Sequence, residues 1–193
     1  MPSPDRKSDL RRRLIAARQE AARARPDAPR ALLHHWPVDL MVAGKTVAGY
    51  APLPGEMDPG PLMAMLSEAG AQLALPVMPE GVGALRFHAY APGDALERRA
   101  FGVLEPRREA QILDPDIILV PLVGADPAGT RLGFGKGYYD RTLEAQRRAR
   151  PVLAVGLAYA EQVLEMLPAD PHDQPLDAVL TDVEFLGISS KPE

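Results

Sequence analysis

The most constraining feature of this sequence is an uninterrupted apolar run, DIILVPLV, at residues 116–123. The run is rich in β-branched residues, does not alternate with polar ones, and is bounded by turn-forming residues. This pattern is typical of a strand in a sheet that is covered on both faces, as parallel sheets are. Even when extended to residue 125, the run is far shorter than the ~20 residues that a membrane-spanning helix needs, so the sequence predicts no membrane partner.

Strand-like and helix-like segments alternate on both sides of this run. We predict strands at 46–51, 73–77, 85–90, 116–123, 152–157 and 178–180, and helices at 5–25, 28–36, 61–69, 143–148 and 161–167. Such alternation is typical of α/β folds, and a length of 193 residues suits one domain. We therefore expect residues 1–193 to form a single three-layer α/β domain, with a central, mainly parallel sheet and helices on both faces.

The charges of the chain are distributed unevenly. The net charge is −4, yet residues 1–30 carry nine lysines and arginines against four acidic residues, and the remainder is acidic. A basic arm of this kind can bind an anionic ligand or RNA, or it can be a solvated helix face, which is the commoner case. The body is too acidic for a general nucleic-acid binder, so we expect no nucleic-acid partner.

The chain contains no cysteine. This excludes disulfides, thiolate metal sites and a cysteine nucleophile. No apolar segment follows the first arginines, so no signal peptide is predicted, and we expect a cytoplasmic protein that is a monomer. The four histidines show no metal-binding spacing, and the sequence has no serine nucleophile motif.

A glycine-rich segment, GADPAGTRLGFGKGYYD, follows the strongest strand at residues 124–140. Ligands of open α/β sheets bind at the carboxyl ends of the strands, where this segment begins. Gly133, Gly135 and Gly137 would let backbone amides approach an anion closely, and the helix that follows would point its positive end the same way. The spacing predicts a phosphate cradle, although a glycine-rich turn that merely ends a strand explains the bare pattern about equally well.

Charged residues of the same segment fit a phosphate site. Lys136 and Arg131 can donate charge-assisted hydrogen bonds to phosphate, and Asp140 can hold a hydrated magnesium ion. The two common phosphate-binding fingerprints do not fit. A Walker loop would need glycine where Thr130 stands and serine or threonine where Gly137 stands, and the dinucleotide fingerprint would need its third glycine two residues later.

Three further residues are candidates for contact with a flat ligand. Tyr138 or Tyr139 could stack on a ring, but adjacent helix residues do not share a face, so we expect at most one to do so while the other packs in the core. Glu56 follows Pro54 and Gly55 just past a predicted strand and could hold a ligand amine. A solvated loop glutamate is the commoner outcome for such a residue on composition alone.

The motif RLGFGKGYYDR at residues 131–141 resembles the signature of the 5-formyltetrahydrofolate cyclo-ligase family (methenyltetrahydrofolate synthetase). Other segments are similar to this family in the same order: Lys7 with Leu10 and Arg11, then residues 50–56, FGVLEP at 101–106, IILVPLV at 117–123, 155–157, 172–173 and LDAVLTD at 176–182. The resemblance therefore covers nearly the whole chain. It departs from the family in lacking the aromatic residue often found shortly before Asp126, and in carrying Lys136 where many members have glycine.

The resemblance implies an enzyme of one-carbon metabolism that converts 5-formyltetrahydrofolate to 5,10-methenyltetrahydrofolate. The reaction would require ATP and Mg²⁺, with no other cofactor, and would release ADP and phosphate by way of a phosphorylated formyl intermediate. A paralogue that acts on another substrate and a non-catalytic folate-binding protein are the alternatives. RNA binding by the basic arm is a weaker one.

The resemblance also implies roles for individual residues. Lys136 and Arg131 would be catalytic, and residues 1–25 would form a basic helix that contributes to the nucleotide site, with its other cations on a solvated face. The ATP-binding residues would be Lys7, Arg11, Arg131, Gly133, Phe134, Gly135, Lys136, Gly137, Tyr138 and Tyr139. The substrate would contact Glu56, Ala51, Tyr138 and Tyr139, and the metal would bind Asp140, with Asp177 as a second candidate.

Overall fold

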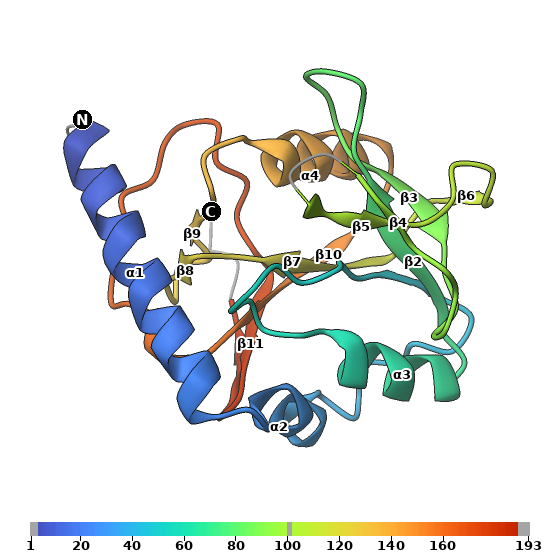
Figure 1. Cartoon of the computed structure of the whole chain (residues 1–193), viewed down its shortest axis with the longest axis horizontal. Coiled ribbons are helices and arrows are strands. Elements are labelled where there is room, and N and C mark those ends of the chain that lie inside the picture. The colour runs from blue at the N-terminus through green and yellow to red at the C-terminus, as the bar shows by residue number, and fades with distance from the viewer. Residues whose placement is uncertain (1–3, 100–101, 189–193) are drawn as a thin grey trace.

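The computed structural model describes residues 4–99 and 102–188, and Figure 1 labels its elements. Its α-helices are α1 (Pro4–Ala24), α2 (Ala28–His35), α3 (Gly60–Glu68) and α4 (Tyr138–Ala149). The strands of the main sheet are β1 (Thr46–Ala48), β2 (Gln72–Val77), β3 (Arg86–Ala89), β6 (Ile112–Leu113), β7 (Ile117–Pro121), β10 (Leu153–Ala158), β11 (Ala178–Thr181) and β12 (Phe185–Gly187). Two hairpins stand apart from it: β4 (Glu97–Arg98) with β5 (Leu104–Glu105), and β8 (Gly124–Ala125) with β9 (Arg131–Leu132).

The main sheet has the strand order β12-β11-β10-β7-β1-β2-β3-β6. The strands from β11 to β2 pair in parallel. Antiparallel pairing is confined to the edges, with β12 on one side and β3 and β6 on the other. The predicted α/β fold with a central, mainly parallel sheet is therefore confirmed.

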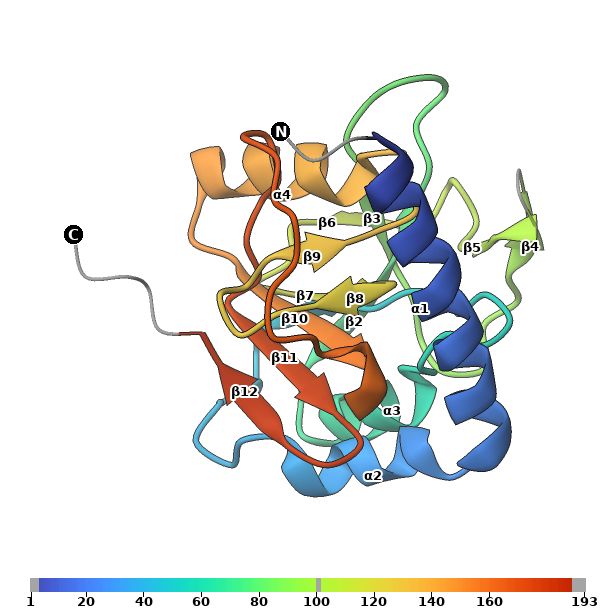
Figure 2. The same cartoon turned by 90° about the vertical axis from the view of Figure 1, so that its left-hand side faces the viewer.

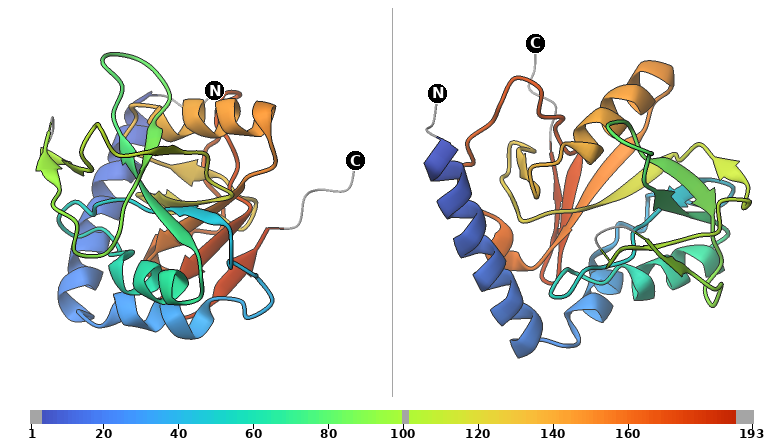
Figure 3. Two further views of the ribbon diagram at one scale, coloured as in Figure 1. Left: turned by 90° about the vertical axis from the view of Figure 1, so that its right-hand side faces the viewer. Right: turned by 45° about the horizontal axis from the view of Figure 1, so that its top comes forward.

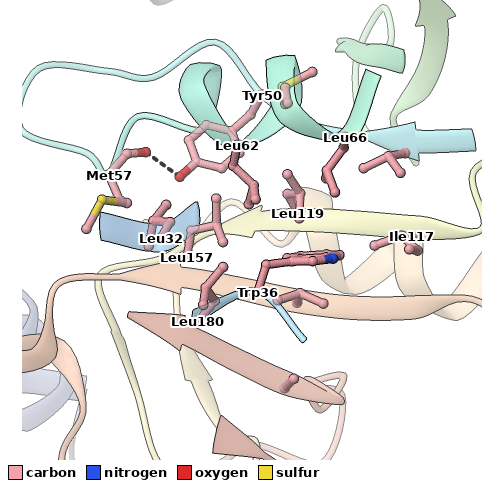
Figure 4. Close-up of a cluster of buried hydrophobic side chains, with 14 of the residues drawn as sticks. Leu32, Trp36, Tyr50, Met57, Leu62, Leu66, Ile117, Leu119, Leu157 and Leu180 are labelled. Atoms are coloured by element: carbon pink, nitrogen blue, oxygen red, sulfur yellow. Dashed lines mark hydrogen bonds between the residues drawn. The ribbon is translucent and has the colours of Figure 1, made fainter. Parts of the chain in front are cut away.

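Strand β7 lies in the middle of the sheet and is buried on both of its faces. Because successive side chains of a strand point to opposite faces, Ile117 and Leu119 pack against α2 and α3, as Figure 4 shows, whereas Ile118 and Val120 pack with Leu143 of α4. All four β7 side chains are almost fully buried. Figure 1 shows α4 on one side of the sheet and α2 and α3 on the other. This double cover explains why the run of residues 116–123 is continuously apolar.

Helix α1 crosses the end of the sheet instead of covering a face, as the views in Figures 2 and 3 show. Its Leu14 packs with Val123, which follows β7, and with Leu132 of β9. Arg25, just past the helix, forms ion pairs with Glu161 at 2.5 Å and with Asp182 at 2.7 Å. The contacts fix the N-terminal helix against segments that come more than a hundred residues later in the chain.

The helix predicted at 161–167 is wrong. Only a short 3-10 helix, η2 (Ala160–Gln162), forms there. The Gln162 side-chain amide donates to the carbonyl oxygens of Leu122 and Val123, at 3.0 Å each, and Leu164 donates its backbone N–H to the Ala125 oxygen at 2.9 Å. These long-range bonds hold the segment in an extended path, so its backbone is not available for the bonds of an α-helix.

Several short elements have no counterpart in the sequence-based prediction. The hairpins β4–β5 and β8–β9 and the strands β6 and β12 contain two or three residues each, too few to show a periodicity. Residues 100–101, which include the start of the FGVLEP segment, lie outside the described residues. In the described ranges, no helix combines the length and the apolar character that crossing a membrane requires.

We expect Leu119→Ala to lower the free energy of unfolding by about 2–5 kcal/mol, because Leu119 is fully buried between β7 and the α2–α3 layer. Urea unfolding followed by circular dichroism measures this change. Val82→Ala is the matched control, since Val82 is 89% exposed, and it should change stability by less than about 0.5 kcal/mol. Equal effects of the two substitutions would contradict the assignment of β7 to the core.

Candidate active site

A cleft with a volume of about 1020 Å³ lies where the parallel strands end. Tyr50 and Ala51, which follow β1, line it together with Pro76 of β2 and Pro121, the last residue of β7. Open α/β sheets bind ligands at the carboxyl ends of their strands, because the loops that follow the strands converge there. The position agrees with the one that the sequence predicts for the glycine-rich segment.

Residues 133–137 connect β9 to α4 and line one end of the cleft. Gly135 has a φ of 86° and Gly137 a φ of 66°, both in the left-handed region that favours glycine. Gly137 is also the residue from which α4 starts, and no side chain caps the amides of the first turn. A glycine-lined loop that leads into an uncapped helix N-terminus gives an anion access to several backbone N–H groups.

Helix α1 brings two cations to the same end of the cleft. Lys7 and Arg11 are four residues apart, so they lie on one face of the helix, and both line the cleft. The Arg11 Nε donates to the Gly133 carbonyl oxygen at 2.7 Å. The Lys7 Nζ lies 2.6 Å from an Asp170 carboxylate oxygen and 3.7 Å from one of Asp173. The N-terminal helix therefore contributes two cations to the lining of the cleft, and their contact with a nucleotide stays a prediction.

Arg131 is the buried cation of the cleft, with 9% of its surface exposed. One of its terminal nitrogens donates to the Asp140 carboxylate, and its guanidinium carbon lies 5.8 Å from the centre of the Tyr139 ring. Its Nε and Nη1 are buried and have no hydrogen-bond partner within the described part of the chain. Buried donors without partners are costly and rare in proteins. This unpaired hydrogen-bonding capacity makes Arg131 the candidate cation for an anionic ligand of the cleft.

The cleft also contains a buried carboxylate, Glu56, which is 8% exposed. One of its oxygens accepts the Leu53 backbone N–H at 2.8 Å, and the other lies 3.5 Å from Nη1 of Arg18. Burial raises the pKa of Glu56, while the Leu53 hydrogen bond and the Arg18 charge oppose that rise. Burial likewise raises the pKa of Tyr139, so its phenol is neutral in the cleft.

Most of the predicted site residues come together in this one cleft. The residues that line it include Lys7, Arg11, Ala51, Glu56, Arg131, Gly133, Phe134, Gly135, Lys136, Gly137, Tyr138, Tyr139 and Asp140. The two tyrosines both reach the cleft and also pack partly against the core on the α4 side of the sheet. Which of them contacts a ligand ring stays a prediction.

Asp177 does not join the cleft. It precedes β11, at the amino ends of the strands, and its carboxylate accepts the Ala154 backbone N–H at 2.7 Å and a bond from Arg147 at 2.8 Å. Arg147 is seven residues beyond Asp140 on α4, which corresponds to about 10 Å along the helix. Asp140 and Asp177 are therefore associated with opposite ends of that helix.

Two features of the site are missed by the sequence-based prediction. Residues 170–173 line the cleft, and Asp170 and Asp173 of this segment pair with Lys7. The sequence signals this segment only through its loose similarity to the family at 172–173. Arg18, predicted among the solvated cations of the basic arm, is 2% exposed. The spacing was a usable signal, because Arg18 follows Leu14 by four residues and thus continues the apolar stripe of the helix.

The lining of the cleft supports an anion at residues 133–137 and an amine-bearing ligand at Glu56. Across residues 4–99 and 102–188, no group of three or more histidine, aspartate or glutamate residues could hold a metal ion by itself. Magnesium characteristically binds through one or two carboxylates together with ligand phosphates. Asp140 is a single carboxylate of this kind, which lines the cleft and pairs with Arg131.

Comparisons with known proteins agree on one family. Residues 3–182 match the model of the 5-formyltetrahydrofolate cyclo-ligase family. Proteins named 5-formyltetrahydrofolate cyclo-ligase from Mycolicibacterium smegmatis and Escherichia coli are each 35% identical to the chain, over 93% and 89% of its length and over 95% and 94% of theirs.

Among solved structures, the 5,10-methenyltetrahydrofolate synthetase of Aquifex aeolicus is similar to the chain with a TM-score of 0.77 and 33% identity, covering 97% of this chain and 95% of that one. The synthetase of Mycoplasma pneumoniae is similar with a TM-score of 0.68 and 25% identity, covering 91% and 98%.

We expect inorganic tripolyphosphate to raise the melting temperature of the protein, because ligand binding to the folded state adds about 2.7 kcal/mol of stability at a hundredfold excess over Kd. Arg131→Met should lose more than half of this shift, since it removes the two unpartnered donors. Thermal unfolding with and without tripolyphosphate measures the shift relative to each variant's own melting temperature. Arg12→Met, at a side chain that is 77% exposed, should retain the full shift, and equal shifts in the two variants would contradict an anion site at Arg131.

Proposed function

The chain belongs to the 5-formyltetrahydrofolate cyclo-ligase family, and we propose that it converts 5-formyltetrahydrofolate to 5,10-methenyltetrahydrofolate with the consumption of ATP. Membership of this enzyme family confirms the resemblance predicted from the RLGFGKGYYDR motif. The observation that carries the proposed reaction is that two buried groups of opposite charge, Arg131 and Glu56, line one cleft. The cation suits a phosphate chain, and the carboxylate suits the amine and amide edge of a pterin.

The nucleotide is proposed to bind at the glycine end of the cleft. Lys7, Arg11 and Arg131 would pair with its phosphates, and the backbone amides of residues 133–137 would donate hydrogen bonds to them. The side chain of Lys136 is proposed to neutralise the transferring phosphoryl group. This assignment is supported by the exposed position of Lys136 on the cleft wall, where a bound phosphate would be within reach of a long side chain.

In the proposed reaction, the protein neutralises charge on the phosphoryl group and positions the two substrates. The formyl oxygen of the folate attacks the γ-phosphorus of ATP, the bond to the bridging oxygen breaks, and ADP leaves. The neighbouring folate nitrogen then attacks the formyl carbon and gives up its proton to water, the carbon–oxygen bond breaks with departure of phosphate, and the methenyl bridge is complete. Arg131 and Lys136 would offset the negative charge that develops in the first step, and the cleft would hold the two substrates in line.

Asp140 is the residue proposed to hold magnesium together with the nucleotide phosphates. Its carboxylate lies beside Arg131, and one of its oxygens accepts the Gln174 backbone N–H at 3.2 Å, so its orientation is fixed. When bound, the ion would supply charge neutralisation at the phosphoryl group. Asp177 is not included in this proposal, because its carboxylate is bonded to Arg147 and to the Ala154 amide outside the cleft.

Glu56 is proposed to bind the pterin end of the folate. An ionised carboxylate accepts two hydrogen bonds from neighbouring N–H groups, which a pterin ring presents along one edge. Ala51 and one of Tyr138 and Tyr139 would form the walls around the ring.

A cytoplasmic location and a monomeric state stay predictions from the sequence.

The reaction is tested by mixing the purified protein with 5-formyltetrahydrofolate, ATP and Mg²⁺ and following the near-ultraviolet absorbance of the methenyl product. We expect the absorbance to grow only when ATP and Mg²⁺ are both present. An increase in this absorbance without ATP would contradict the proposed phosphoryl transfer. Binding of the folate without turnover, by protein shown to be folded, would favour a folate-binding role instead.

Lys136→Ala should lower kcat, or raise the KM for ATP, by roughly tenfold or more, because a charge-assisted hydrogen bond to the transferring group is lost. The melting temperature should hardly change, since Lys136 is exposed. Lys45→Ala is the charge-matched control, because Lys45 precedes β1 at the opposite edge of the sheet and does not line the cleft. Steady-state kinetics of both variants decide the matter, and equal activity of Lys136→Ala and the unaltered protein would refute the role of Lys136.

A further inference from the structure

Arg18 of α1 lies directly behind the cleft without lining it. Its side chain makes three contacts: Nη1 is 3.5 Å from a Glu56 carboxylate oxygen and 3.3 Å from the Leu122 carbonyl oxygen, and its guanidinium carbon is 5.4 Å from the centre of the Phe134 ring. Glu56 and Phe134 both line the cleft. A single buried guanidinium therefore contacts two residues that line the cleft.

The arrangement is an unfavourable one for stability alone. A buried ion pair gains little net stability over apolar side chains of similar volume, because both charges must lose their hydration. The separation of 3.5 Å is long for a strong hydrogen bond, and Arg18 Nε is buried with no partner among the described residues. Neighbouring positions of the same helix face, Leu14 and Ala21, are apolar and buried, so an apolar residue would fit the pattern better at this point of the helix.

The groups that face Glu56 explain what Arg18 can do. Tyr50 and Tyr139 both lie near enough to Glu56 for an electrostatic interaction with its carboxylate. Burial raises the pKa of each phenol, so both tyrosines are neutral and contribute no charge. The Arg131 guanidinium is engaged by Asp140, and the Leu53 amide contributes a dipole without a net charge. Arg18 is thus the cation that acts on the Glu56 carboxylate, and it lowers a pKa that burial would otherwise raise further.

We propose that Arg18 is a positioning residue, which holds the Glu56 carboxylate ionised and aimed into the cleft to receive the N–H groups of the bound pterin. This inference rests on the proposed function, in which Glu56 binds that end of the folate. Arg18 itself makes no contact with the ligand.

The test is the pH dependence of the Kd for 5-formyltetrahydrofolate, measured by titration of intrinsic fluorescence in the absence of ATP. In Arg18→Met the pKa of Glu56 should rise, so the carboxylate should be protonated at a higher pH than in the unaltered protein. Affinity should therefore fall by roughly tenfold or more at neutral pH and recover toward the normal value as the pH is raised to about 9. Arg18→Lys, which keeps a charge, should lie between the two profiles.

Three controls separate this role from a merely structural one. Glu56→Gln should weaken binding by a factor that is constant over the same pH range, because its amide does not titrate. Phe134→Leu removes the ring contact alone and should leave the midpoint of the pH profile unchanged. Binding of tripolyphosphate to Arg18→Met should stay within about threefold of normal, because Arg18 contacts Glu56, Leu122 and Phe134 and none of the cations proposed to bind the anion.

A parallel loss of folate and tripolyphosphate affinity at every pH would overturn the proposal, since it would indicate general damage to the fold. An unshifted profile in Arg18→Met would overturn it as well. If Arg18→Met does not fold, Arg18→Gln provides the same comparison with a polar, uncharged side chain. Failure of the unaltered protein to bind 5-formyltetrahydrofolate would instead refute the proposed function, so the two failures are distinguishable.

Discussion

The structure depends on the burial of β7 from both sides. Its odd-numbered side chains pack against α2 and α3 and its even-numbered ones against α4, so the strand has no solvated face. Parallel neighbours on each side complete its hydrogen bonding. Because such a strand can exist only at the centre of a covered parallel sheet, it also determines where the chain must leave the core. That exit, after Pro121, opens into the cleft.

The cleft combines residues that are widely separated along the chain. The glycine loop and the start of α4 follow β7 after the β8–β9 hairpin, and glycine gives the loop the left-handed conformation of Gly135 and Gly137. Lys7 and Arg11, in contrast, reach the cleft because α1 lies across the end of the sheet (Figure 2), where the Arg11 guanidinium bonds to the Gly133 carbonyl oxygen. Charge from the most basic part of the sequence is thereby brought against the glycine loop and the uncapped N-terminus of α4.

The sequence predicts the parts of this protein that follow from local pattern. The central strands, the first helices and the glycine loop are all marked by apolar runs, helical spacing or turn residues, and they form where expected. The helix predicted at 161–167 fails because the Gln162 side chain bonds to carbonyl oxygens forty residues away, which no local pattern encodes. Asp177 fails to reach the cleft for a similar reason, since its partner Arg147 is known only once the helix is placed. Arg18 was obscured by its arginine-rich surroundings, although its position on the face shared by Leu14 and Ala21 indicates burial.

The way in which α1 is anchored bears on how the protein is made. Arg18 contacts Glu56 and Leu122, but Lys7 and Arg11 have their partners 163 and 122 residues further along the chain, at Asp170 and Gly133. Because a chain is synthesised from its N-terminus, the first turns of α1 cannot complete their contacts until the residues around 170 have been made. The lining of the cleft is therefore incomplete in a nascent chain until residues 170–173 join it.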